Sequence, residues 1–199
     1  MNFPKQVDPF FLMSAVITLV MVASSDPWWT ITGKSQNLLA IQVSPFYLLT
    51  SVTGLSSTVP VAQMLGPMTR ILLVLGFLSM GMISIIPSAW WHDLAVCFSL
   101  SVLAEVYLSF ALLYHAAETS LLGAYGVIPP SSGTARLSTT IVGLDLNLHF
   151  QPLVIAGFSV VFYLGFVTFG LIGASLVASH VRAKKERRQR GVAAVFTSD

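Results

Sequence analysis

Hydrophobic residues gather in four long stretches of the chain, which are separated by segments richer in polar residues. A bilayer core of about 30 Å needs about 20 apolar residues in a helix, with about 17 as a lower limit. Four stretches reach that length: Pro9 to Ser25, Ile71 to Trp91, Leu94 to Ala117 and Pro152 to Val181. The pattern therefore predicts an all-α membrane bundle of four transmembrane helices.

The segment between the first and second stretches has the character of β structure. Trp28 to Thr32 and Leu39 to Val43 flank the turn-rich residues Gly33 to Asn37, an arrangement suited to a hairpin. Leu38 to Leu55 is apolar, but it contains Pro45 and many β-branched and aromatic residues, which favour a strand over a lipid-facing helix. We expect extracytoplasmic β structure here.

The segment between the third and fourth stretches predicts a further strand. From Ile141 to Phe150, apolar and polar residues alternate with a period of two, which places them on opposite faces of one half-buried strand. Residues Arg136 to Val142 are expected to extend this strand or to pair with it. Because a lone hairpin is marginal in water, we expect the two outer loops to form one small extracytoplasmic antiparallel β-sheet.

Composition strengthens the membrane interpretation. Of the 199 residues, 55% are hydrophobic and 9% are charged, and the mean hydropathy is +0.80, whereas an ordinary soluble domain has about 25% charged residues. We therefore divide the chain into a cytoplasmic N-terminus (1–8), a four-helix transmembrane domain (9–181) with outer loops 26–69 and 118–151, and a basic cytoplasmic tail (182–199).

Basic residues set the expected orientation. Because cytoplasmic flanks collect Lys and Arg, the tail places the C-terminus in the cytoplasm, and four spans place the N-terminus there as well. We expect a multi-pass protein of the plasma (cell) membrane, whose tail contacts anionic lipid rather than nucleic acid. The basic residues of the tail are Arg182, Lys184, Lys185, Arg187, Arg188 and Arg190.

Tryptophans fall at the ends of the first two stretches, where amphipathic indole rings are expected to act as interfacial anchors. They are Trp28, Trp29, Trp90 and Trp91. The first stretch also fits a second interpretation, because Lys5 before it and small residues at 23–25 are typical of a cleaved signal peptide. Cleavage there would leave three spans.

The predicted architecture resembles that of the claudin-type tetraspan membrane proteins. The shared features are four spans, both termini inside, a larger first outer loop with Trp28-Trp29 near its start, a shorter second loop and an outer sheet. The resemblance covers most of the chain and is architectural, since residues 24–69 lack the two cysteines that claudins carry there. It implies a scaffold or assembly role rather than catalysis.

Glu105 is the acidic residue within a predicted span. An ionised group at the membrane centre costs about 2.5–3.5 kcal/mol on insertion scales, so its side chain should face protein or water. Ser101 and Ser109 lie four residues to either side on the same helix face and predict an intramembrane polar site. A structural hydrogen bond, a subunit contact and a proton or cation relay all remain open. Candidate partners on other helices are Ser14, Thr18, Ser79 and Thr168.

Small residues recur along one face of the fourth stretch and would let another helix approach closely. The face consists of Gly170, Gly173, Ala174 and Ala178. Packing within the bundle and packing against another subunit are both compatible with this pattern.

Two histidines towards the outer face give a metal hypothesis. His115 and His149 with Glu118, Asp145 or Asp26 would supply ligand types that zinc or copper accepts, but their spacing is no motif, and interfacial or solvated histidines are the simpler interpretation. The single cysteine, Cys97, excludes an internal disulfide.

The sequence contains no familiar catalytic motif, and we expect no cofactor. We expect a non-enzymatic integral membrane accessory, assembly or scaffold subunit, with lipid and other membrane-protein subunits, or a second copy of itself, as partners. One alternative is a small proton-conducting, ion-conducting or transporter subunit that uses Glu105. Another is a metal-dependent membrane enzyme with outer His and carboxylate ligands.

Overall fold

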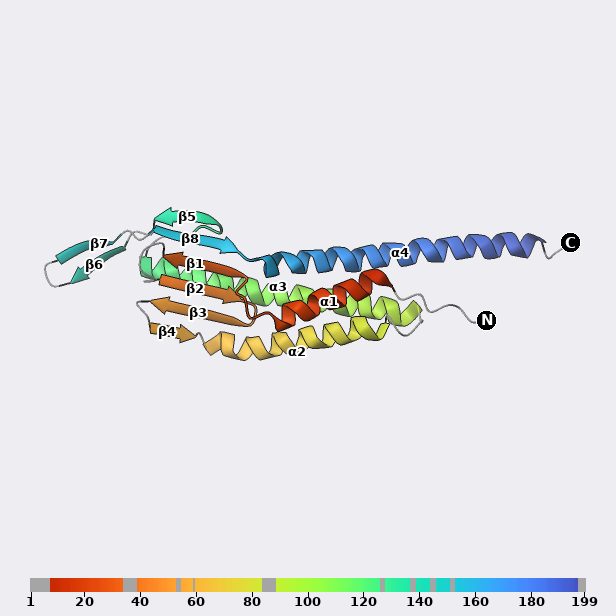
Figure 1. Cartoon of the computed structure of the whole chain (residues 1–199), viewed down its shortest axis with the longest axis horizontal. Coiled ribbons are helices and arrows are strands. Elements are labelled where there is room, and N and C mark those ends of the chain that lie inside the picture. The colour runs from red at the N-terminus through yellow and green to blue at the C-terminus, as the bar shows by residue number, and fades with distance from the viewer. Residues whose placement is uncertain are drawn as a thin grey trace.

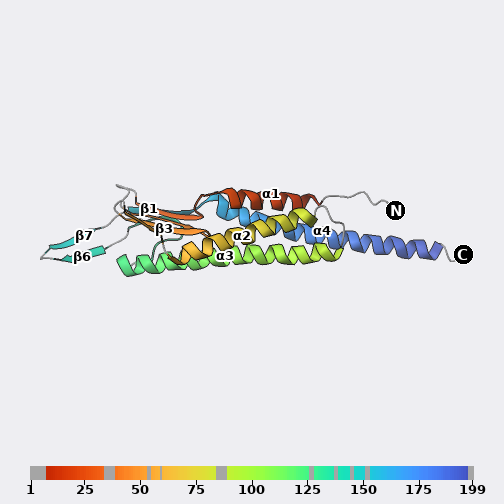
Figure 2. The same ribbon diagram turned by 90° about the horizontal axis from the view of Figure 1, so that it is seen from below.

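In the residues that it describes, the computed structural model is mostly helical, with four helices and two antiparallel sheets (Figure 1). The helices run roughly along one axis, and the sheets lie at the opposite end from the start of α1 and the end of α4 (Figures 1 and 2). The structure describes residues 8–33, 39–52, 55–58, 60–83, 89–125, 128–136, 139–143, 146–150 and 153–196.

The helices are α1 (Pro9–Ala23), α2 (Pro60–Ile83), α3 (Ala89–Tyr125) and α4 (Val160–Phe196). α1 packs against α2 and α4, and α2 packs against α3. Within the described residues, three segments are long and apolar enough to cross a membrane: Ala62–Met82, Trp91–Gly123 and Val160–Arg182. α1 is also apolar but shorter, at 15 residues.

The main sheet has six antiparallel strands in the order β4-β3-β2-β1-β8-β5. Its strands are β1 (Trp29–Gly33), β2 (Leu39–Ser44), β3 (Tyr47–Val52), β4 (Leu55–Thr58), β5 (Gly133–Arg136) and β8 (Leu153–Phe158). The predicted hairpin is confirmed, since Ile31 of β1 lies opposite Ile41 of β2. On its other side β1 pairs with β8, and Ile31 lies opposite Ala156. Segments that precede α2 and follow α3 in the sequence therefore share one sheet.

Residues 141–150, predicted as one strand, instead belong to a two-stranded hairpin. β6 (Thr139–Gly143) pairs with β7 (Leu146–Phe150), and Gly143 lies opposite Leu146. Both arms of a hairpin keep the period of two, so alternation alone does not reveal where the chain reverses. In both views the hairpin extends beyond the main sheet (Figures 1 and 2), and β6 also contacts α3.

Two helix boundaries also differ from the prediction. α4 begins at Val160, and the preceding residues 153–158 form β8, because a short apolar run fits a buried strand as well as a helix. α2 begins at Pro60 rather than Ile71, since proline is tolerated in the first turn. α3 continues to Tyr125. The first turns of α2 and the last turns of α3 therefore lie within the predicted outer loops, beside the sheet.

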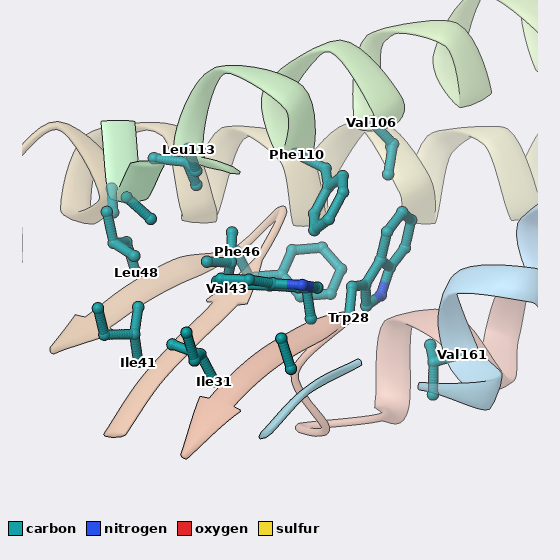
Figure 3. Close-up of a cluster of buried hydrophobic side chains, with 14 of the residues drawn as sticks. Trp28, Ile31, Ile41, Val43, Phe46, Leu48, Val106, Phe110, Leu113 and Val161 are labelled. Atoms are coloured by element: carbon teal, nitrogen blue, oxygen red, sulfur yellow. The ribbon is translucent and has the colours of Figure 1, made fainter. Parts of the chain in front are cut away.

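One hydrophobic core joins the sheet to the helices. Side chains from β1 and β2 meet α3 side chains such as Phe110, and Trp28 lies between them (Figure 3). A smaller cluster at the other end joins all four helices and includes Phe11, Met80 and Ile172. Because the sheet and the helices share a core, the sheet cannot move independently of them without exposing apolar surface.

Gly66 sets the distance between α2 and the β2–β3 turn, because a Cβ atom there would overlap the carbonyl oxygen of Phe46. We expect Gly66→Ala to lower the free energy of unfolding by about 1–3 kcal/mol, the usual cost of overpacking. Gly170→Ala is the matched control, since nothing lies within 4 Å of its added Cβ. Thermal unfolding of both variants in detergent checks this, and equal loss of stability in the two would contradict it.

Candidate functional site

Glu105 lies near the sheet end of the region where all four helices run together. Trp28, which follows α1, contacts Tyr107 at a ring distance of 5.2 Å. The Tyr107 hydroxyl donates a hydrogen bond of 2.6 Å to the carbonyl oxygen of Phe162, in the first turn of α4. α1 therefore ends and α4 begins close to the level of Tyr107. Glu105 is central in α3 only because α3 continues beside the sheet.

The Glu105 carboxyl group belongs to a small hydrogen-bonded cluster between α2 and α3. The Ser109 hydroxyl donates to its Oε1 atom at 2.9 Å. Thr69 of α2 lies 3.5 Å from the Ser109 oxygen and donates to the Leu65 carbonyl at 3.0 Å. The Oε2 atom is buried and has no hydrogen-bond partner among the described residues. The cluster thus holds one carboxyl oxygen firmly and leaves the other unsatisfied within the part of the chain that the structure describes.

Ser101 does not extend this cluster in the other direction. Its side chain is exposed, and its hydroxyl donates to the Cys97 carbonyl one turn earlier. The hydroxyl groups that the sequence offered on other helices also bond carbonyl groups of their own helices, and Ser79 in addition lies 3.3 Å from Ser99. Hydroxyls satisfied in this way stabilise local backbone rather than form a continuous polar path.

A second polar cluster lies at the opposite end of the helices. The Ser175 hydroxyl of α4 donates to Asp8 Oδ2 at 2.6 Å, while Asp8 Oδ1 accepts the Phe10 N–H at 3.0 Å and caps α1. His92 of α3 lies 3.4 Å from the same hydroxyl and 3.9 Å from the carboxylate. The cluster therefore joins α1, α3 and α4. Sequence analysis did not find it, because Asp8 and Ser175 are 167 positions apart.

Ser175, His92 and Asp8 lie close together, but their hydrogen bonds do not follow the order of a hydrolytic triad. A triad needs the serine to donate to histidine and the histidine to donate to the carboxylate. Here Ser175 donates directly to Asp8, and its side chain is fully buried. The second ring nitrogen of His92 instead faces Asp93, at 3.7 Å. The arrangement fits a clasp between helices better than a nucleophile.

The small-residue face of α4 is uncovered. Gly170 and Gly173 are exposed, and no atom lies within 4 Å of a Cβ placed on either of them; Ala174 and Ala178 are half-buried. By contrast, Gly165 packs directly under the Tyr107 ring. The bundle therefore uses Gly165 for close packing and leaves the predicted face open.

Trp28 and Trp29 are fully buried, so neither contacts lipid as the interfacial anchor that the sequence suggested. The reason is that a short connection leads the chain from α1 into β1 and carries both rings into the core. Trp29 Nε1 donates to the Ser131 carbonyl at 2.8 Å. Trp91, at the other end, is 49% exposed, and the side chain of Trp90 lies outside the described residues.

The remaining predicted residues are scattered. His115 is exposed and lies 3.8 Å from Glu118, while Asp26 is an exposed residue between α1 and β1. Asp145 and the His149 side chain lie outside the described residues, within which no group of three or more His, Cys, Asp and Glu side chains could hold a metal ion.

The basic tail continues α4 as a helix (Figure 1). Arg182 and Lys184 are exposed. The side chains of Lys185, Arg187, Arg188 and Arg190 lie outside the described residues.

Comparison with known proteins identifies no relative: no family model matches the chain, and no curated protein matches it significantly.

Ser109 is the residue on which the Glu105 cluster depends. Ser109→Ala removes the donor to Oε1 and leaves a buried acceptor without a partner, so we expect it to cost about 1–3 kcal/mol of unfolding free energy. Ser101→Ala, on the same helix, removes only an exposed hydrogen bond to the Cys97 carbonyl and should change the unfolding free energy by less than about 0.5 kcal/mol. Thermal or denaturant unfolding in detergent compares the two, and a neutral Ser109→Ala would show that the cluster is not structural.

Proposed function

We propose that the four helices span a membrane and that the protein is a non-enzymatic accessory, assembly or scaffold subunit of a membrane complex. The observation that carries this proposal is the core shared by the sheet and the helices, in which Trp28 and Trp29 are fully buried. A sheet fixed in this way is a rigid platform on a membrane anchor. Such a platform suits a protein that holds partners in position.

Exposed apolar surface supports the membrane part of the proposal. Every helix presents large, exposed apolar side chains, for example Met13 of α1, Met64 of α2, Leu108 of α3 and Val177 of α4. In water, surface of this extent would drive association, whereas lipid covers it without cost. The 15 residues of α1 rise only about 22 Å, which local bilayer thinning and the polar residues at its ends can accommodate.

Charge supports one orientation. α4 continues beyond its apolar part with exposed Arg182 and Lys184, towards the end of the molecule where α1 begins (Figure 1). Because basic residues prefer the cytoplasmic side, we infer that this end faces the cytoplasm and that the sheet lies on the outer side. The membrane in this proposal is the plasma membrane. Four helices with a sheet drawn from the segments α1–α2 and α3–α4 also agree with the claudin-type architecture that the sequence resembles.

Two surfaces are available to partners under this proposal. The first is the hairpin of β6 and β7, which pair with each other rather than with the main sheet and extend beyond that sheet (Figure 2). The uncovered face of α4 around Gly170 and Gly173 would admit a transmembrane helix of another subunit or of a second copy. One surface lies in water and the other in lipid, so a partner with both a membrane span and an outer domain can use both.

The test compares the full chain with a variant in which residues 139–150 are replaced by a short Gly-Ser turn. We expect both proteins to resist carbonate extraction from membranes and to melt at similar temperatures, because the six-stranded sheet remains. Native mass spectrometry after gentle detergent extraction should show stoichiometric partner subunits with the full chain and fewer with the variant. A full chain that travels as a lone monomer would contradict the accessory role.

A proton or cation relay through Glu105 is the second candidate function. The observation in its favour is the buried Oε2 atom, which has no partner among the described residues. Proteoliposomes loaded with a pH-sensitive dye separate the two candidates, with Ser101→Ala as the matched control. For a scaffold we expect no proton flux above that of protein-free liposomes and no change with Glu105→Gln. Flux that Glu105→Gln abolishes and Ser101→Ala preserves would favour the relay.

A further inference from the structure

A cleft of about 400 Å³ opens between the β2–β3 turn and the first turns of α2. Phe46, Tyr47 and Leu48 line it on the sheet side, and Gln63, Pro67 and Arg70 line it on the helix side. Most of these side chains are apolar or aromatic, and Arg70 is the charged residue among those that line the cleft. The cleft therefore offers an apolar wall and a cation at the junction of sheet and helices.

Arg70 is held over this cleft by an aromatic contact. Its guanidinium carbon lies 5.0 Å from the centre of the Phe46 ring. Among the described residues no ion pair joins Arg70 to a carboxylate. A guanidinium group stacked in this way keeps its N–H donors at its edge, where they can form paired hydrogen bonds with a phosphate group.

Tyr47, on the sheet side, adds no negative charge to the cleft. Burial, and to a smaller extent the nearby Asp26 carboxylate, raise the pKa of the Tyr47 hydroxyl, while Arg70 lowers it. The hydroxyl stays neutral at physiological pH and donates to the Ser25 carbonyl at 2.8 Å. The described side chains that line the cleft therefore carry no anion, and Asp26, the carboxylate near Tyr47, is not among the lining residues and forms no ion pair with Arg70.

The surface below Arg70 shows what kind of ligand fits. Exposed apolar side chains continue along α2 from Arg70 away from the sheet: Ile71, Val74, Leu75 and Leu78. A ligand that places an anionic group at Arg70 and lays an apolar chain along this surface is an amphiphile. The protein itself supplies the arrangement of a phospholipid site, with a cation above and hydrocarbon-compatible surface below.

We propose that this cleft binds one anionic phospholipid from the leaflet on the sheet side, with Arg70 paired to the phosphate group. The cleft walls contact the glycerol region and the first methylene groups, and the acyl chains continue along α2. This inference rests on the proposed membrane function. It gives the platform a lipid-dependent contact where the β2–β3 turn meets α2.

The test uses the full chain, delipidated in detergent, with phosphatidylglycerol as the probe and phosphatidylcholine as the neutral comparison. Native mass spectrometry counts retained lipid, and a thermal shift titration gives the apparent affinity. We expect Arg70→Gln to weaken phosphatidylglycerol binding about tenfold or more, because a charge-assisted pair is lost. Arg136→Gln removes an exposed cation of β5 and should bind as the unaltered protein does. Gln63→Trp, which keeps Arg70 and fills the cleft, should also weaken binding.

Each result bears on a stated claim. Equal retention of phosphatidylglycerol by the unaltered protein, Arg70→Gln and Arg136→Gln overturns the lipid site. Competition by inorganic phosphate or glycerol phosphate at the same concentration as the lipid also overturns it and indicates a free-anion site. Carbonate extraction of the chain from membranes overturns the membrane function and the lipid site together. A chain that stays in the membrane, yet binds both lipids equally, overturns the lipid site alone.

Discussion

The structure depends on the burial of two consecutive tryptophans at the junction of helices and sheet. Trp28 contacts Tyr107 and Phe162, and so ties the exit of α1 to α3 and α4. Trp29 begins β1, lies opposite Phe158 of β8, and donates to the Ser131 carbonyl. Aromatic rings bury the largest apolar area of any side chains, so this one dipeptide fixes the sheet against three helices. The platform that a scaffold requires follows from that constraint.

Two polar clusters then set how the helices align along their axes. Apolar contacts are not directional, whereas a hydrogen bond in a low-dielectric interior requires particular atoms to meet. The Glu105 cluster fixes α2 relative to α3, and the Asp8 cluster fixes α1 relative to α4. The clusters lie at opposite ends of the shared helical region, where such bonds resist both sliding and tilting.

Sequence patterns predicted elements well where the signal is local. The first hairpin and the strands around Pro45 follow from turn residues and β-branched composition, and all four helices were placed. Sequence patterns missed three features: the start of α2, the reversal of the chain within 139–150 and the strand at 153–158. A short apolar run fits a helix as well as a strand, and an alternating pattern fits one long strand as well as a hairpin of two. Thr69 as the Ser109 partner and Ser175 as the Asp8 partner depend on helix packing, which no local pattern encodes.

Arg70 shows why charge in an apolar chain is informative. A guanidinium group on a membrane-spanning helix is costly unless it reaches water or an anion, and an exposed cation–π contact such as that with Phe46 returns only about 0.5–1 kcal/mol. The contact alone does not offset the cost, so the guanidinium must reach water or an anion. Its position at the apolar cleft, where the sheet meets α2, makes both available at once. A lysine there would gain less, because it lacks the planar fork that stacks on Phe46 while binding phosphate.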